Sequence, residues 1–129
     1  MTDNPTITKT LSCMKLDEKL LISFGAEIIR YAAGDFIFEE EASPSYYYQI
    51  LKGSIKENNY NELGNEFIQN ILGDSQSFGD SFLFLNKKYN INAVALSDCE
   101  ILRLKKDDFF SLIDQHPKIS VDTNKCLSQ

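Results

Sequence analysis

The spacing of apolar positions changes twice along the chain, and each change separates a helical segment from a β-rich one. From Leu11 to Phe24, apolar residues recur at roughly helical intervals, and Gly25 follows as a plausible C-cap. Near the other end, the apolar residues between Phe109 and Ile113 predict a short helix, with Asp107-Asp108 as its N-terminal cap. The two predicted helices therefore flank a central region with a different pattern.

That central region alternates short β-prone runs with turn residues at intervals of about 8–12 residues, which is typical of a β-sandwich or barrel. In the run Tyr46–Leu51, period-two alternation places Tyr46, Tyr48 and Ile50 on one face and the intervening residues on the other. The segment after Gly73-Asp74 is predicted to be irregular. The predicted strands are Glu27–Tyr31, Phe36–Phe38, Tyr46–Leu51, Ser54–Asn58, Glu66–Leu72, Ile91–Leu96 and Glu100–Leu104.

The length of 129 residues fits one domain with a single core. Residues 1–10 are polar and are expected to form a flexible N-terminus. Residues 11–117 are expected to form the domain with its flanking helices, the last of which Pro117 stops. Residues 118–129 contain few large apolar side chains and are interpreted as a tail or the start of a truncated helix.

The charge balance argues against several partners. The net charge is −6 and Arg30 and Arg103 are the two arginines, so we expect this chain alone not to bind DNA. No apolar run approaches the roughly 20 residues that a membrane span requires, and no secretory signal is evident. Three cysteines without a Cys-x-x-Cys pair indicate free thiols and a cytoplasmic location.

The most informative segment runs from Phe78 to Ile91. Gly79 stands where the backbone can approach a ligand or adopt a positive φ, and Asp80 follows at the head of a short apolar turn. Backbone N–H groups at such a turn can bind an anion, and the carboxylate can accept hydrogen bonds from hydroxyls. Asp80 could equally cap the turn without touching a ligand. Phe78, Phe82, Leu83 and Phe84 are expected to be core and helix-packing residues.

The order and spacing of several short motifs resemble the cyclic-nucleotide-binding domain of Crp/Fnr (catabolite activator) transcriptional regulators, from about Leu16 to His116. The resemblance implies a mainly β fold, a cyclic-nucleotide-binding-domain-like β-roll (double-stranded β-helix or jelly roll) with flanking α-helices. It rests on the N-terminal helix and on Gly34-Asp35-Phe36-Ile37-Phe38, Tyr46–Leu51 with Lys52-Gly53, Gly73-Asp74, Phe78-Gly79-Asp80, Asp98-Cys99 and Phe109.

The resemblance also implies a phosphate-binding cassette around residues 78–91. In the family its acid holds the ribose 2′-hydroxyl and its arginine pairs with the cyclic phosphate. Here the acid position is Asp80, and the arginine position falls on Tyr89 or Asn90, neither of them cationic. Lys87 or Lys88 could substitute only as a flexible point charge. The candidate ligand-binding residues are Phe78, Gly79, Asp80, Ser81, Tyr89, Asn90 and Ile91.

These observations favour a non-catalytic, ligand-sensing regulatory domain with an unidentified small-molecule effector. An arginine–phosphate pair is the strong part of a cyclic-nucleotide site, so tight binding of cyclic AMP or cyclic GMP is not expected. One alternative is a degenerate stand-alone module for protein–protein interaction, and another, more remote, is a cupin-like enzyme. A single histidine, His116, supplies neither a metal site nor a catalytic triad, so we expect no cofactor and no enzymatic activity. A homodimer stays open.

Overall fold

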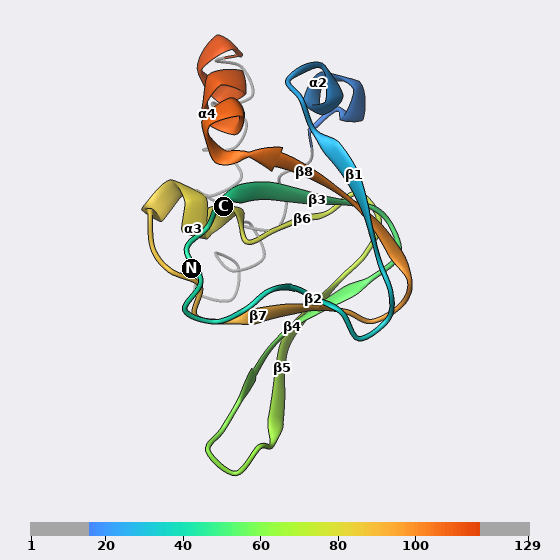
Figure 1. The fold of residues 1–129 in the computed structure, drawn as a ribbon, viewed down its shortest axis with the longest axis vertical. Helices are drawn as coiled ribbons and strands as arrows, with labels where there is room; N and C mark the ends of the chain where they lie inside the picture. Colours follow the sequence, from blue (N-terminus) through green and yellow to red (C-terminus); the bar gives the residue numbers. More distant parts are fainter. Residues whose placement is uncertain (1–15, 117–129) are drawn as a thin grey trace, which may run out of the picture.

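The computed structural model describes residues 16–116, which form two four-stranded antiparallel sheets accompanied by short helices (Figure 1). The mainly β roll predicted from the sequence is therefore confirmed. The expectations for residues 1–10 and 118–129, and for the first turns of the N-terminal helix, lie outside the described residues.

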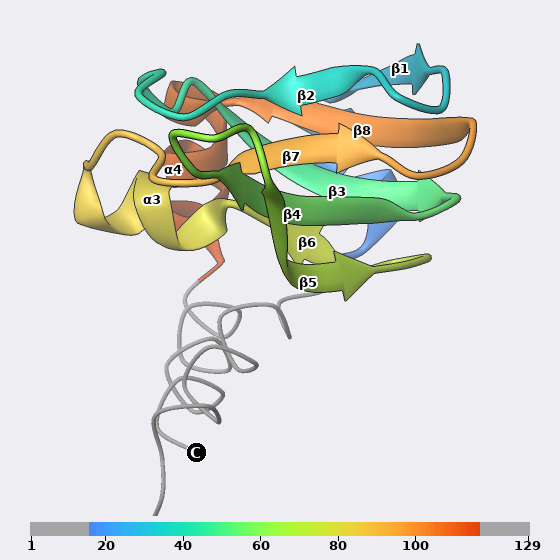
Figure 2. The ribbon, with the colours of Figure 1, turned by 90° about the horizontal axis from the view of Figure 1, so that it is seen from below.

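The strands of each sheet come from distant parts of the chain, and the two sheets lie face to face (Figure 2). The hairpin of β4 and β5 extends beyond the rest of the domain (Figure 1). In spatial order, the first sheet contains β1 (Glu27–Tyr31), β8 (Cys99–Lys105), β3 (Tyr46–Lys52) and β6 (Ser77–Phe78), and the second contains β2 (Phe36–Phe38), β7 (Asn92–Ala95), β4 (Ile55–Tyr60) and β5 (Glu66–Leu72).

The helices are α2 (Glu18–Ser23), α3 (Asp80–Leu85) and α4 (Lys106–Gln115). Helix α2 begins with a side-chain cap, because the Asp17 carboxylate accepts a hydrogen bond from the backbone N–H of Leu20 at 3.0 Å. The predicted Asp107-Asp108 cap of α4 was wrong. Lys105 occupies the N-cap position without a side-chain hydrogen bond, and the two aspartates lie in the first turn, where the helix dipole favours carboxylates.

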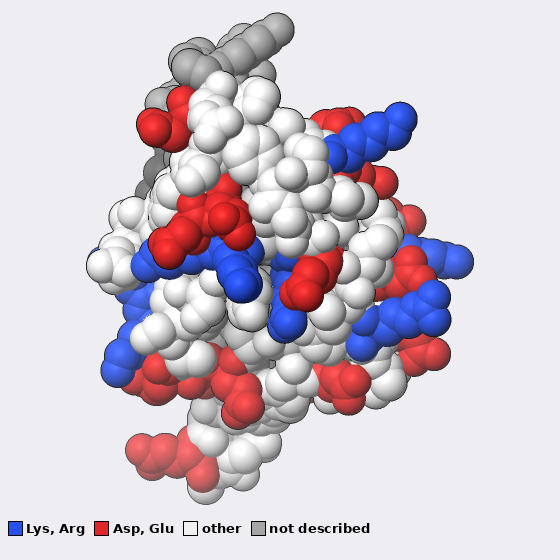
Figure 3. Space-filling view, turned by 45° about the horizontal axis from the view of Figure 1, so that its top comes forward, with Lys and Arg blue, Asp and Glu red and all other residues white. Residues whose placement is uncertain are grey.

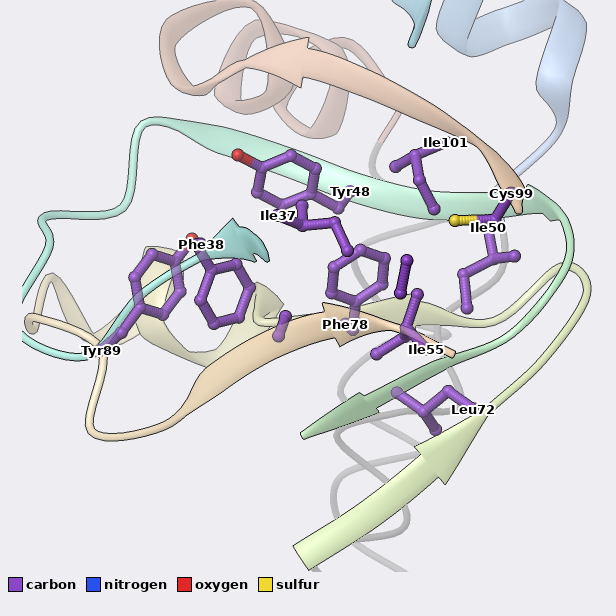
Figure 4. Packing of buried hydrophobic residues seen from close by; sticks show 12 residues of the cluster. Ile37, Phe38, Tyr48, Ile50, Ile55, Leu72, Phe78, Tyr89, Cys99 and Ile101 are labelled. Atoms are coloured by element: carbon purple, nitrogen blue, oxygen red, sulfur yellow. The ribbon is translucent and has the colours of Figure 1, made fainter. Parts of the chain in front are cut away.

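Strand β3 separates two apolar clusters, as its alternating pattern predicts. Tyr48 and Ile50 face the space between the sheets, where they pack with the residues shown in Figure 4. Tyr47 points the other way and stacks on Phe109 of α4, with ring centroids 4.5 Å apart and planes 4° from parallel. One strand thus holds the sheets together and anchors the C-terminal helix.

One further expectation needs correction. The segment predicted to be irregular contains β6, a two-residue strand that pairs with Tyr48 and Gln49 and is too short to show a period. Phe84, expected to be a core or helix-packing residue, is 40% exposed and packs against α4. Its ring lies edge-on to the rings of Phe109 and Phe110.

Candidate functional site

A polar cavity of about 400 Å³ opens between the β4–β5 hairpin and the start of α3. Five of the seven candidate residues line it, so the structure brings most of the predicted cassette to one place. Its lining consists of Gly79, Asp80, Ser81, Asn90 and Ile91 from the cassette, together with Glu57, Asn59, Gln69, Asn70 and Phe82.

Gly79 is required where the chain enters this cavity. Its φ of +73° lies in the left-handed region. A Cβ at this position would lie 2.9 Å from a ring carbon of Phe38 and 3.2 Å from one of Tyr89. The glycine therefore allows both the sharp turn into α3 and the close approach of two aromatic rings.

Asp80 follows as the first residue of α3 and is 4% exposed. Its Oδ1 accepts a hydrogen bond from the Ser77 hydroxyl at 3.2 Å. Burial raises the pKa of Asp80 to about 7, and the negative charge of Glu57 adds to the rise, whereas the hydrogen bond from Ser77 opposes it. The carboxyl lies at the cavity wall and does not cap α3, whose N-cap is Gly79.

Glu57 is a second buried acid in the cavity, and the sequence analysis missed it. It lies on β4 directly opposite Asn70 of β5, and the Asn70 side chain hydrogen-bonds to its carboxyl. Burial raises the pKa of Glu57 to about 7, against the effect of that hydrogen bond. The available signal was period two, since Glu57 follows Ile55 by two residues and so shares its inward face.

Amide side chains bridge the elements around the cavity. The Gln69 amide donates to Asn59 Oδ1 at 3.1 Å, and the Asn59 amide donates to the backbone carbonyl of Asn90 at 2.7 Å. This chain of hydrogen bonds connects β5, β4 and the segment before β7. The hairpin is therefore tied to the C-terminal end of the cassette.

The other two candidate residues, Phe78 and Tyr89, point into the apolar core between the sheets. Tyr89 is 2% exposed and stacks flat on Phe38, with ring centroids 3.7 Å apart (Figure 4). Its backbone is fixed as well, because its N–H donates to Ala42 and its carbonyl accepts from Glu41. Lys87 and Lys88 are exposed and do not line the cavity.

Within residues 16–116, no group of three His, Cys, Asp or Glu side chains is arranged to hold a metal ion. No helix in this part of the chain is long and apolar enough to span a membrane. On the face drawn in Figure 3, basic and acidic side chains are interspersed.

The family model for the cyclic nucleotide-binding domain matches residues 28–116. This range includes seven complete strands, all of β1 except its first residue, and the candidate residues 78–91. The chain belongs to this family. This cyclic nucleotide-binding domain is a sensor-type domain, and the volume of its cavity is within the range of small-molecule sites.

Solved structures share the fold. A transcriptional regulator from Thermotoga maritima superposes with a TM-score of 0.77 at 20% identity, covering 88% of each chain. The catabolite activator protein of Thermus thermophilus superposes with a TM-score of 0.75 at 24% identity, covering 85% of this chain and 51% of that one.

A curated relative is a much longer protein. The lysophospholipase nte1 of Aspergillus niger is 23% identical over 124 residues. The alignment covers 96% of this chain but 8% of the relative. The chain thus spans a small fraction of that protein's length.

Proposed function

We propose that this cyclic nucleotide-binding domain is a non-catalytic regulatory sensor, of the kind found in Crp/Fnr-type regulators, that does not bind cyclic AMP or cyclic GMP tightly. The observation that carries the proposal is the charge of the cavity. Among residues 16–116, its lining includes two buried carboxyls, Glu57 and Asp80, and neither lysine nor arginine.

A cyclic phosphate in this cavity would meet no cation. Hydrogen bonds to charged groups contribute about 1.5–3 kcal/mol each, so the loss of two lowers affinity by roughly two to four orders of magnitude. Ionised Glu57 and Asp80 would in addition repel the phosphate. Both effects weaken the binding of an anionic ligand to the cavity. Neither effect weakens the binding of a neutral or cationic ligand.

The same reasoning supports a role in regulation and not in catalysis. The described lining of the cavity contains two acids and several amides, but no histidine and no cysteine. No group of metal-ligating side chains is found in residues 16–116. With a net charge of −6, the chain by itself is not expected to bind DNA. Any regulated output would then depend on a partner domain or protein, such as the DNA-binding or lipase regions of longer relatives.

Restoring a cation at the cassette tests the proposal. Asn90→Arg would place a guanidinium at the cavity lining, and Tyr89→Arg would place one at the neighbouring position. We expect wild type to give no saturable heat with cyclic AMP, and at least one variant to gain binding, as measured by titration calorimetry. Lys87→Ala and Lys88→Ala serve as controls, because both lysines are exposed. Tight binding by wild type would contradict the proposal, and loss of that binding in either lysine variant would identify the substitute cation.

A protein-interaction module is the second candidate, and an exposed apolar surface on the β4–β5 hairpin favours it. Strand β5 is the edge of its sheet among the described strands. Its Phe67, Ile68 and Ile71 side chains are each more than half exposed. Self-association at rising concentration in sedimentation velocity, abolished by Phe67→Ser and Ile71→Ser, would support this role. A monomer at all concentrations would argue against a homodimer through this strand.

A further inference from the structure

The two buried acids of the cavity come from separate elements and pair with no cation in the part of the chain that the structure describes. Glu57 lies on β4, and Asp80 lies at the start of α3. The groups that act on them are Asn70 and Ser77, which donate hydrogen bonds, and each other's charge. Lys56, which neighbours Glu57 in sequence, has its ammonium paired with Glu66 at 2.6 Å.

Tyr47 and Tyr89 also feel the charge of Asp80, since it contributes to the rise of both phenol pKa values. Both phenols are neutral near pH 7, so they provide no counter-charge. Ionising both acids inside the cavity therefore costs free energy that a bound cation would recover.

The size and lining of the cavity indicate which cation would fit. A volume of about 400 Å³ is within the range of small-molecule sites. A bare calcium ion takes six to eight oxygen ligands, mainly carboxylates, whereas the cavity has two carboxyls and no group of three His, Cys, Asp or Glu side chains in residues 16–116 is arranged to hold a metal ion. Asn59, Gln69, Asn70, Asn90 and Ser81 offer both donors and acceptors, a combination suited to hydroxyl groups.

We propose that the cavity binds a small amino polyol, with its ammonium between Glu57 and Asp80 and its hydroxyl groups against the surrounding amides. This assignment rests on the sensor function proposed above and names its ligand class. Ligand charge is then the discriminating property, because the two acids attract an amine and repel a phosphate or carboxylate.

Three polyols of nearly equal size test the assignment: glucamine, which carries an amine, sorbitol, which is neutral, and gluconate, which is anionic. We expect titration calorimetry at pH 8 to show glucamine binding at least about tenfold tighter than sorbitol, from one charge-assisted contact, and no binding of gluconate. Glucamine should bind more weakly at pH 5.5, where Glu57 and Asp80 are protonated.

Glu57→Gln should reduce the preference for glucamine over sorbitol, and Asp80→Asn provides the same test should the first variant fold poorly. Glu62→Gln is the matched control, because Glu62 is exposed in the hairpin loop and does not line the cavity. Absence of glucamine binding at millimolar concentration, equal affinity for gluconate, or an unchanged glucamine affinity in Glu57→Gln would each overturn the assignment. Tight cyclic AMP binding by wild type would instead overturn the proposed function itself.

Discussion

The ring of Tyr89 lies flat against the ring of Phe38, with centroids 3.7 Å apart and planes 6° from parallel. From the resemblance to the family, Tyr89 is one of the two residues expected at the position of the cassette's phosphate-pairing arginine. Here the side chain at that place packs in the core and is 2% exposed. At this expected arginine position, the side chain therefore makes an aromatic contact in the core and supplies no cation to a phosphate in the cavity.

The Tyr89 hydroxyl has no hydrogen-bond partner among the described residues, although it is buried. An unsatisfied buried hydroxyl costs about 1–3 kcal/mol, so Tyr89→Phe should leave the free energy of unfolding unchanged or raise it by about 1 kcal/mol. Tyr47→Phe is the control, because the Tyr47 hydroxyl donates to Gln49 at 2.6 Å and its loss should cost about 1 kcal/mol. Urea unfolding measures both, and an equal loss in the two variants would contradict this reading of Tyr89.

Gly79→Ala should be more destabilising than Gly64→Ala. Both glycines have positive φ, +73° and +85°, so both variants carry backbone strain of about 1 kcal/mol. Only at Gly79 would the new Cβ also collide with Phe38 and Tyr89, whereas nothing lies within 4 Å at Gly64. Overpacking adds about 1–3 kcal/mol, a difference that thermal or urea unfolding would resolve. Equal losses would mean that the aromatic rings move aside freely.

The buried acids predict a specific pH dependence of stability. The pKa values of Glu57 and Asp80 are both about 7 in the folded chain, whereas the ordinary values of 4.5 and 3.8 apply when the chain is unfolded. Between about pH 4 and pH 7 the folded state therefore holds more protons, and stability falls as the pH rises through this window. For one group whose pKa is raised in this way, the free energy of unfolding falls by roughly 3 kcal/mol across the window.

Glu57→Gln removes one of these titrations, so its free energy of unfolding should fall less than that of wild type between pH 5 and pH 8. Urea unfolding at a series of pH values measures the difference, and the exposed Glu62→Gln should follow wild type. Parallel curves for wild type and Glu57→Gln would show that Glu57 titrates normally in the folded chain.

Much of the fold could be predicted because period-two patterns are local. Tyr46–Leu51 shows its two faces in six letters, and turn residues such as Lys52-Gly53 mark its end. Strand β6 could not be found in this way, since two residues carry no period and its pairing with β3 depends on tertiary contacts. The wrong cap of α4 reflects a choice among adjacent polar residues that only the backbone geometry decides.

The candidate site could be predicted from the sequence only in part. The Gly79-Asp80 pair could be found because a glycine before an acid at a turn is a local signal. The sequence left open whether Tyr89 or Asn90 takes the arginine position. In the structure Tyr89 enters the core and Asn90 lines the cavity. Glu57 and the amides of the β4–β5 hairpin join the site only through strand pairing, which no local pattern specifies.

We propose that the cavity lacks the positive charge needed to hold a cyclic phosphate. The decisive measurement is titration calorimetry of the wild-type chain with cyclic AMP and with cyclic GMP, at pH 7 and physiological salt. We expect no saturable binding of either nucleotide at micromolar concentration. Micromolar or tighter binding of either one would contradict the proposal.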